Sequence, residues 1–81
     1  MNEDMIKKTM KKDFKEVCRK LEKQYSKVNG DSLYNVIILK DIVIGTVTAW
    51  RDVGIETEDL QPLKDMYLNL VKLMVEVIEK K

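Results

Sequence analysis

The feature that most constrains this chain is a predominantly apolar run from Leu33 to Trp50, rich in Val, Ile and Thr. At about 18 residues it approaches the length of a membrane-spanning helix. However, Lys40 and Asp41 lie at its centre, and a charged side chain there costs about 2.5–3.5 kcal/mol at the middle of a bilayer. We therefore expect no membrane span and interpret the run as part of a folded core.

The run can be a helix or a β-hairpin, and its periodicity favours the helix. Between 32 and 53 the polar or small residues Asp41, Gly45, Thr48 and Asp52 recur at helical spacing. A hairpin would place "KD" as the turn between "NVIIL" and "IVIGTVTAW", but that turn lacks the Gly or Asn that favoured hairpin turns require. The predicted helix collects the following apolar and small residues on one face: Val36, Leu39, Ile42, Val43, Thr46, Val47, Trp50 and Val53.

A second helix is predicted at 5–28, where apolar residues recur every three or four positions in an arc of about 120°. The sequence "NGDS" then provides a boundary, because Gly30 can close one helix and Asp31 or Ser32 can cap the next. The apolar stripe consists of Ile6, Met10, Phe14, Val17, Cys18, Leu21, Tyr25 and Val28.

A third helix is predicted at 59–79, after a stop at Gly54. Its polar positions form a narrow stripe and leave an apolar arc of roughly 220°. We expect Thr57 or Asp59 to be its N-cap, and Pro62 to lie within its first turn, where a missing N–H costs little.

Together these segments predict an all-α fold with a single domain over 1–81, a three-helix antiparallel bundle of helices about 22 residues long. An α-β-hairpin-α arrangement is the alternative. Such a bundle would leave apolar residues uncovered, and an 81-residue chain buries little surface by itself. We therefore expect a helical homodimer, with an interface formed by Ile37, Ile44, Trp50, Leu68, Val71 and Val75.

The residue types present exclude most catalytic chemistry. The chain has no histidine, which removes the commonest general base and metal ligand. It has no C-x-x-C, no phosphate-binding glycine loop and no calcium loop. Its single cysteine, Cys18, lies on an apolar stripe and is interpreted as a small buried hydrophobe. We predict no catalytic, cofactor-binding or metal-binding residues and no enzyme activity.

The formal net charge of +1 conceals an asymmetry. Residues 1–28 carry nine Lys/Arg against five Asp/Glu, whereas 29–81 carry six against nine. Five cations fall within about 80° on the side of the first helix opposite its apolar stripe. They could face solvent, or bind an acidic partner or a phosphate backbone: Lys8, Lys12, Lys15, Arg19 and Lys23.

Two classes of function follow. The first is a non-enzymatic protein-binding or assembly module, such as a regulator, inhibitor or adaptor, that acts as a homodimer. The second, the alternative, is an accessory protein that binds nucleic acid through the basic face. A cytoplasmic location is expected, since one cysteine cannot form an intrachain disulfide and "MNEDMIKKTMKK" lacks the apolar core of a signal peptide.

Overall fold

The computed structural model of the chain describes residues 3–29 and 32–80, and it contains three helices. These are α1 (Glu3–Lys27), α2 (Leu33–Asp52) and α3 (Thr57–Glu79). No strand occurs in the described ranges. The prediction of an all-α chain is confirmed, the helix ends lie within two residues of their expected positions, and the hairpin alternative for the apolar run is wrong.

The start of α2 is set by Ser32. Its backbone is extended and its side-chain oxygen accepts a hydrogen bond from the Asn35 N–H at 3.3 Å, as expected for an N-cap. The other two expected boundary residues, Gly30 and Asp31, lie outside the described residues. The helix α2 therefore forms despite its many β-branched residues, because Ser32 caps its start and its apolar face is packed.

The turn between α2 and α3 closes at Gly54, as predicted. Its φ of 109° lies in the left-handed region that favours glycine. The Ile55 N–H donates to the Trp50 carbonyl at 3.0 Å and the Gly54 N–H to the Arg51 carbonyl at 3.1 Å, which is the Schellman pattern of a helix end. Ile55, the residue after Gly54, is buried in the core, so the turn itself contributes to the core.

The start of α3 differs from the prediction. The helix begins at Thr57, and its N-cap is Glu56, which makes no side-chain capping bond. Neither Thr57 nor Asp59 is the N-cap. Because the helix begins two residues earlier than expected, Pro62 lies in its second turn, where it has no N–H to donate to the Glu58 carbonyl. The acids Glu58 and Asp59 in the first turn favour the helix through its dipole.

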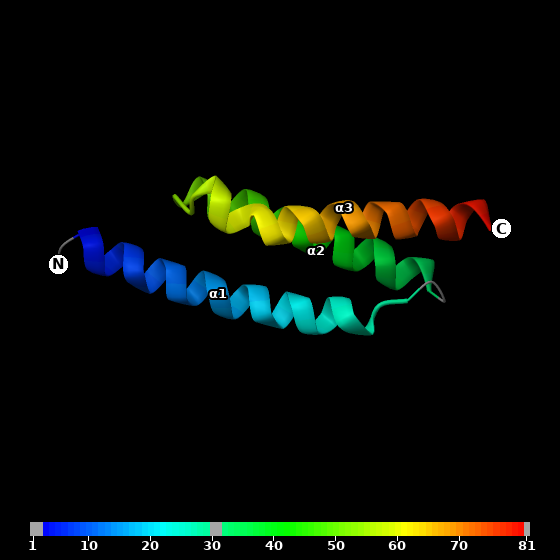
Figure 1. Cartoon of the computed structure of the whole chain (residues 1–81), viewed down its shortest axis with the longest axis horizontal. Helices are drawn as coiled ribbons and strands as arrows, with labels where there is room; N and C mark the ends of the chain where they lie inside the picture. The colour runs from blue at the N-terminus through cyan, green and yellow to red at the C-terminus, as the bar shows by residue number, and fades with distance from the viewer. Residues whose placement is uncertain (1–2, 30–31, 81) are drawn as a thin grey trace.

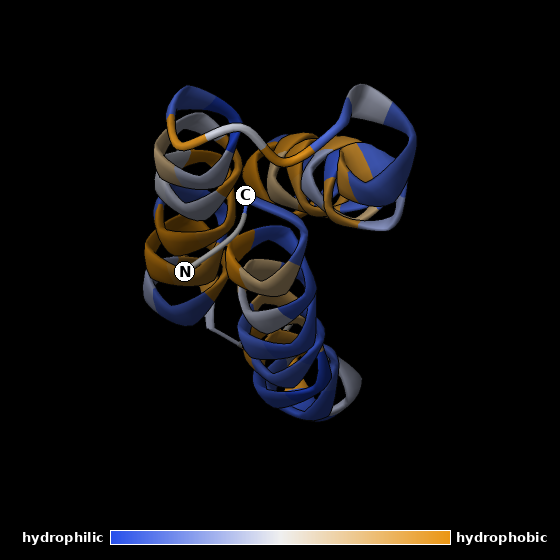
Figure 2. Ribbon diagram, turned by 90° about the vertical axis from the view of Figure 1, so that its left-hand side faces the viewer, coloured by the Kyte–Doolittle hydropathy of each residue, from blue (hydrophilic) through white to orange (hydrophobic). Residues whose placement is uncertain are grey.

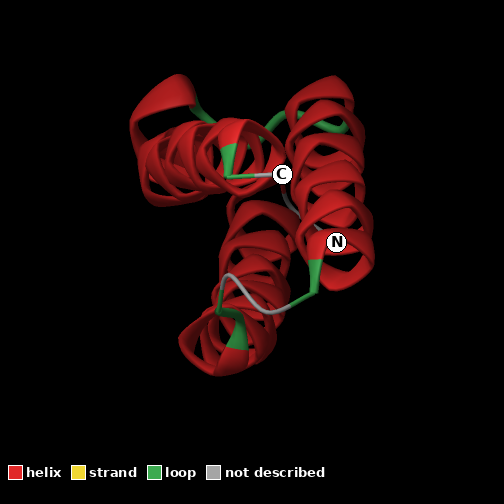
Figure 3. Cartoon of the chain, turned by 90° about the vertical axis from the view of Figure 1, so that its right-hand side faces the viewer, coloured by secondary structure: helices red, strands yellow, loops and turns green. Residues whose placement is uncertain are grey.

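The three helices form an elongated body of 55 × 18 × 16 Å. Successive helices run in opposite directions, the N-terminal end of α1 projects beyond the α2–α3 turn, and the C-terminal end of α3 projects beyond the start of α2 (Figure 1). Seen from the end, α2 and α3 lie side by side and α1 lies below them (Figure 3). The pair α2–α3 is closely packed, whereas α1 touches it over a smaller area.

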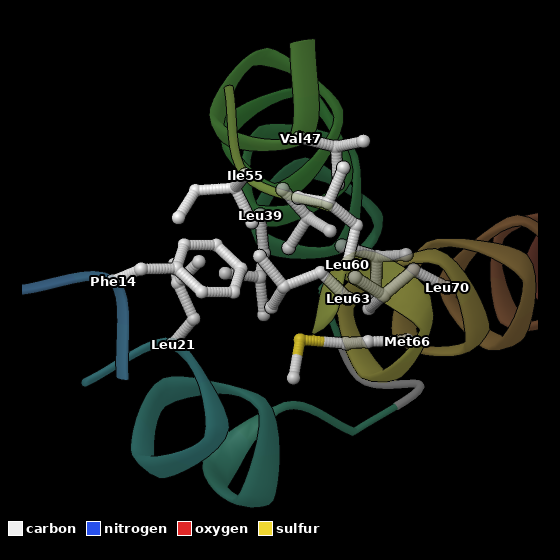
Figure 4. Packing of buried hydrophobic residues seen from close by; sticks show 11 residues of the cluster. Phe14, Leu21, Leu39, Val47, Ile55, Leu60, Leu63, Met66 and Leu70 are labelled. Carbon is white, nitrogen blue, oxygen red and sulfur yellow. The ribbon is translucent and has the colours of Figure 1, made fainter. Parts of the chain in front are cut away.

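The core lies mainly between α2 and α3. Leu60, Leu63 and Leu70 of α3 are fully buried, and they meet the buried face of α2. From α1 only Phe14 and Leu21 are buried, and they point into the same cluster (Figure 4). The buried face of α2 consists of Val36, Leu39, Val43 and Val47. The helix α2 is thus covered on one side by its own chain.

Gly45 and Gly54 provide a matched pair of substitutions that test this fold. Gly54 needs its positive φ, so Gly54→Ala should lower the free energy of unfolding by about 1–2 kcal/mol. Gly45 lies within α2 and a Cβ there would meet no atom within 4 Å. Gly45→Ala should therefore raise the free energy of unfolding by about 0.5–1 kcal/mol. Urea unfolding at one protein concentration measures both changes. Equal effects of the two substitutions would contradict the assigned turn.

Candidate interaction surfaces

One apolar surface lies on the side of α2 and α3 that faces away from α1. On α3, Met66 points into the cluster near Leu21 of α1, and Val75 follows nine residues later, half a turn around the helix (Figure 4). On α2, Ile42 lines a groove with α1, and Ile44 lies about 200° around the helix from it. We call this face the outer surface, and its residues are Ile37, Ile44, Leu68, Val71 and Val75.

The outer surface is open to solvent in the single chain. Leu68 is 55% exposed, Val75 is 42% exposed and Ile44 is 38% exposed. Ile37 and Val71 are half-buried. By helical spacing, five of the six residues expected at an interface fall on this side of α2 and α3.

Trp50, the sixth expected interface residue, lies elsewhere. Its ring packs against Phe14 of α1 at a centroid distance of 5.5 Å and an interplanar angle of 59°. This tilted geometry is typical of aromatic pairs in a core. Trp50 is half-buried and joins α1 to α2, so it belongs to the packing within the chain.

A second apolar surface was not expected from the sequence. Ile42 was placed on the core face, yet it is 45% exposed, and Ile38 is 39% exposed. They line a groove of about 490 Å³ between the end of α1 and the start of α2. The groove opens because α1 covers α2 only in part. The spacing of Tyr34, Ile38 and Ile42 at four residues could have indicated this stripe.

Together the two surfaces make α2 apolar around much of its circumference. In Figure 2 the ribbon of α2 is orange on both sides, whereas the ribbon of α1 is largely blue. Among the described helices, α2 has the length and composition of a membrane span, with a mean hydropathy of 1.4. The core helix of a soluble protein passes the same test, so this property does not locate the chain in a membrane.

The five predicted cations of α1 all lie exposed on the side opposite its buried residues. Arg19 forms an ion pair with Glu16. No acidic partner is found among the described residues for the side chains of Lys8, Lys12, Lys15 and Lys23. Lys11, which is not part of this row, lies 3.9 Å from Asp59 of α3.

A groove of about 660 Å³ separates α1 from the start of α3, and Cys18 lines it with Phe14 and Pro62. Partial burial raises the pKa of the Cys18 thiol, and the nearby carboxylates of Glu22 and Asp59 raise that pKa further. A raised pKa means less thiolate at neutral pH and hence a less reactive cysteine. In the described part of the chain no three potential ligands gather to hold a metal ion.

No protein family, curated protein or solved structure matches this chain.

The environment of Cys18 predicts slow alkylation. Its reaction with iodoacetamide at pH 8 should be slower in the folded chain than in the urea-unfolded chain, because burial and two carboxylates raise the thiol pKa. Glu22→Gln should speed the reaction of the folded chain by removing one of these charges. Glu79→Gln, a distant exposed acid, is the control and should leave the rate unchanged. Equal rates in folded and unfolded wild type would contradict the shifted pKa.

Proposed function

We propose that this chain is a non-enzymatic assembly module that pairs with a second copy of itself through the outer surface. The single observation that carries the proposal is the exposure of apolar residues from two helices on one face. Contiguous apolar surface of this kind marks protein interfaces. The pairing completes a core that one chain leaves open, and it extends the three helices into a closed antiparallel assembly.

The size of the exposed surface supports this proposal. The single chain exposes 6073 Å², whereas a compact monomer of 9.5 kDa would expose about 5,050 Å². The radius of gyration is 14.6 Å, compared with about 11.7 Å for a compact domain of this length. The excess of about 1,000 Å² is close to the roughly 800 Å² that each partner buries in a stable interface.

The geometry of the outer surface also suits an isologous pair. In a two-fold dimer the same patch meets itself, so each apolar residue finds an apolar surface on the other copy. Its residues come from two helices that pack against each other, so the dimer would join two α2–α3 pairs through one shared core. As a regulator, inhibitor or adaptor, such a dimer would act by occupying a partner's surface.

The sedimentation mass tests this proposal. Wild type at micromolar concentration should have twice the 9.5 kDa chain mass. The double variant Leu68→Lys, Val75→Lys should raise the dimer Kd at least about tenfold, because four charges would enter an apolar interface. Both residues are exposed in the single chain, so its helical circular dichroism should be kept.

The matched control is Ile38→Lys, Ile42→Lys, which places the same charges on the other side of α2. It should keep the dimer mass. A monomeric wild type would overturn self-pairing. A dimer that is lost in the control but kept in the first variant would move the interface to the α1–α2 groove.

A further inference from the structure

The feature of the molecule that the assembly proposal does not use is the row of cations on α1. Its members are exposed, and they lie opposite Phe14 and Leu21, which hold α1 to the core. We propose that this row binds the phosphate backbone of double-stranded nucleic acid without reading the base sequence. The row consists of Lys8, Lys12, Lys15, Arg19 and Lys23.

The geometry of the row is that of a straight line of charge. Its members follow one another at three or four residues and span about 22 Å along the helix. Glu16 and Glu22 flank the row, and Glu16 is ion-paired with Arg19, whereas the four lysines of the row have no acidic partner among the described residues. Like charges at these spacings repel each other and destabilise an isolated helix. A polyanion laid along the row would remove that repulsion.

The chemistry of the row favours nucleic acid over other acidic partners. Lysine binds phosphate as a point charge, and a duplex presents evenly spaced phosphates along its length. A helix that binds at a lipid surface also needs bulky apolar anchors, and none of the exposed aromatic or branched residues of the chain lies between the members of this row. No aromatic side chain is available on this face to stack on a base, so only the backbone is recognised.

The row and the outer surface are independent of each other. In the fold α1 lies below the α2–α3 pair (Figure 3). The outer surface lies on the side of that pair away from α1, so pairing through it would leave both rows open to solvent. The dimer would then carry two cation rows, one on the α1 of each chain. Each single chain has a complete row of its own. Loss of pairing therefore leaves backbone binding in place, and the two proposals fail separately.

Fluorescence anisotropy with a labelled random-sequence DNA duplex tests the inference. The affinity of wild type should fall by about 500-fold between about 50 and 200 mM salt if all five cations contact phosphates, because each phosphate contact releases a counterion. Lys12→Glu, Lys15→Glu, Arg19→Glu should weaken binding at the lower salt at least tenfold. Its salt dependence should also become shallower, since three of the contacts are lost.

The control variant is Lys20→Glu, Lys72→Glu, Lys80→Glu, whose three positions are exposed and lie outside the row. It changes the net charge by the same amount and should weaken binding no more than about threefold, as expected for a long-range charge effect. Absent binding at low salt, or an equal loss in both variants, would overturn the inference. Row-dependent binding to phosphatidylserine vesicles but not to the duplex would also overturn it, as would binding only to an acidic polypeptide such as polyglutamate.

Discussion

The structure depends on one constraint, which is that α2 is apolar around much of its circumference and the chain is too short to cover it. Its valine face packs closely against the leucines of α3, and this contact forms most of the core. The isoleucines of α2 lie on two other sides of the helix, where they are covered only in part. The long, thin shape and the excess exposed surface both follow from this imbalance.

The helix α1 has a different role, because its apolar stripe is narrow and its other faces are charged. It is attached to the α2–α3 pair by Phe14, Leu21 and the contact between Phe14 and Trp50. This attachment places the cations on one side of the molecule and leaves the outer surface on the other. The proposed functions are thus separated in space, with apolar pairing through α2 and α3 and charge on α1.

Sequence periodicity predicted the three helices well, because residues of one polarity recur at helical spacing in each segment. The Ser32 cap and the Gly54 turn are local interactions, and both were confirmed. The start of α3 was predicted less well. Thr57 and Asp59 are both capping residue types, yet the helix begins at Thr57 and its N-cap, Glu56, makes no side-chain capping bond. The local capping preference of these two residues therefore did not locate the start of α3.

The sequence by itself determined which residues lie on the same side of each helix, because the 3.6-residue period depends only on order along the chain. It therefore placed the cations of α1 on one side of that helix and the apolar residues of α3 on one wide arc. Only the tertiary structure decided which sides are covered. Trp50 and Ile42 were predicted on the same apolar face of α2, but Trp50 meets Phe14 while Ile42 stays open to solvent. That difference arises from where α1 lies, and the relative placement of helices is a long-range property that periodicity does not contain.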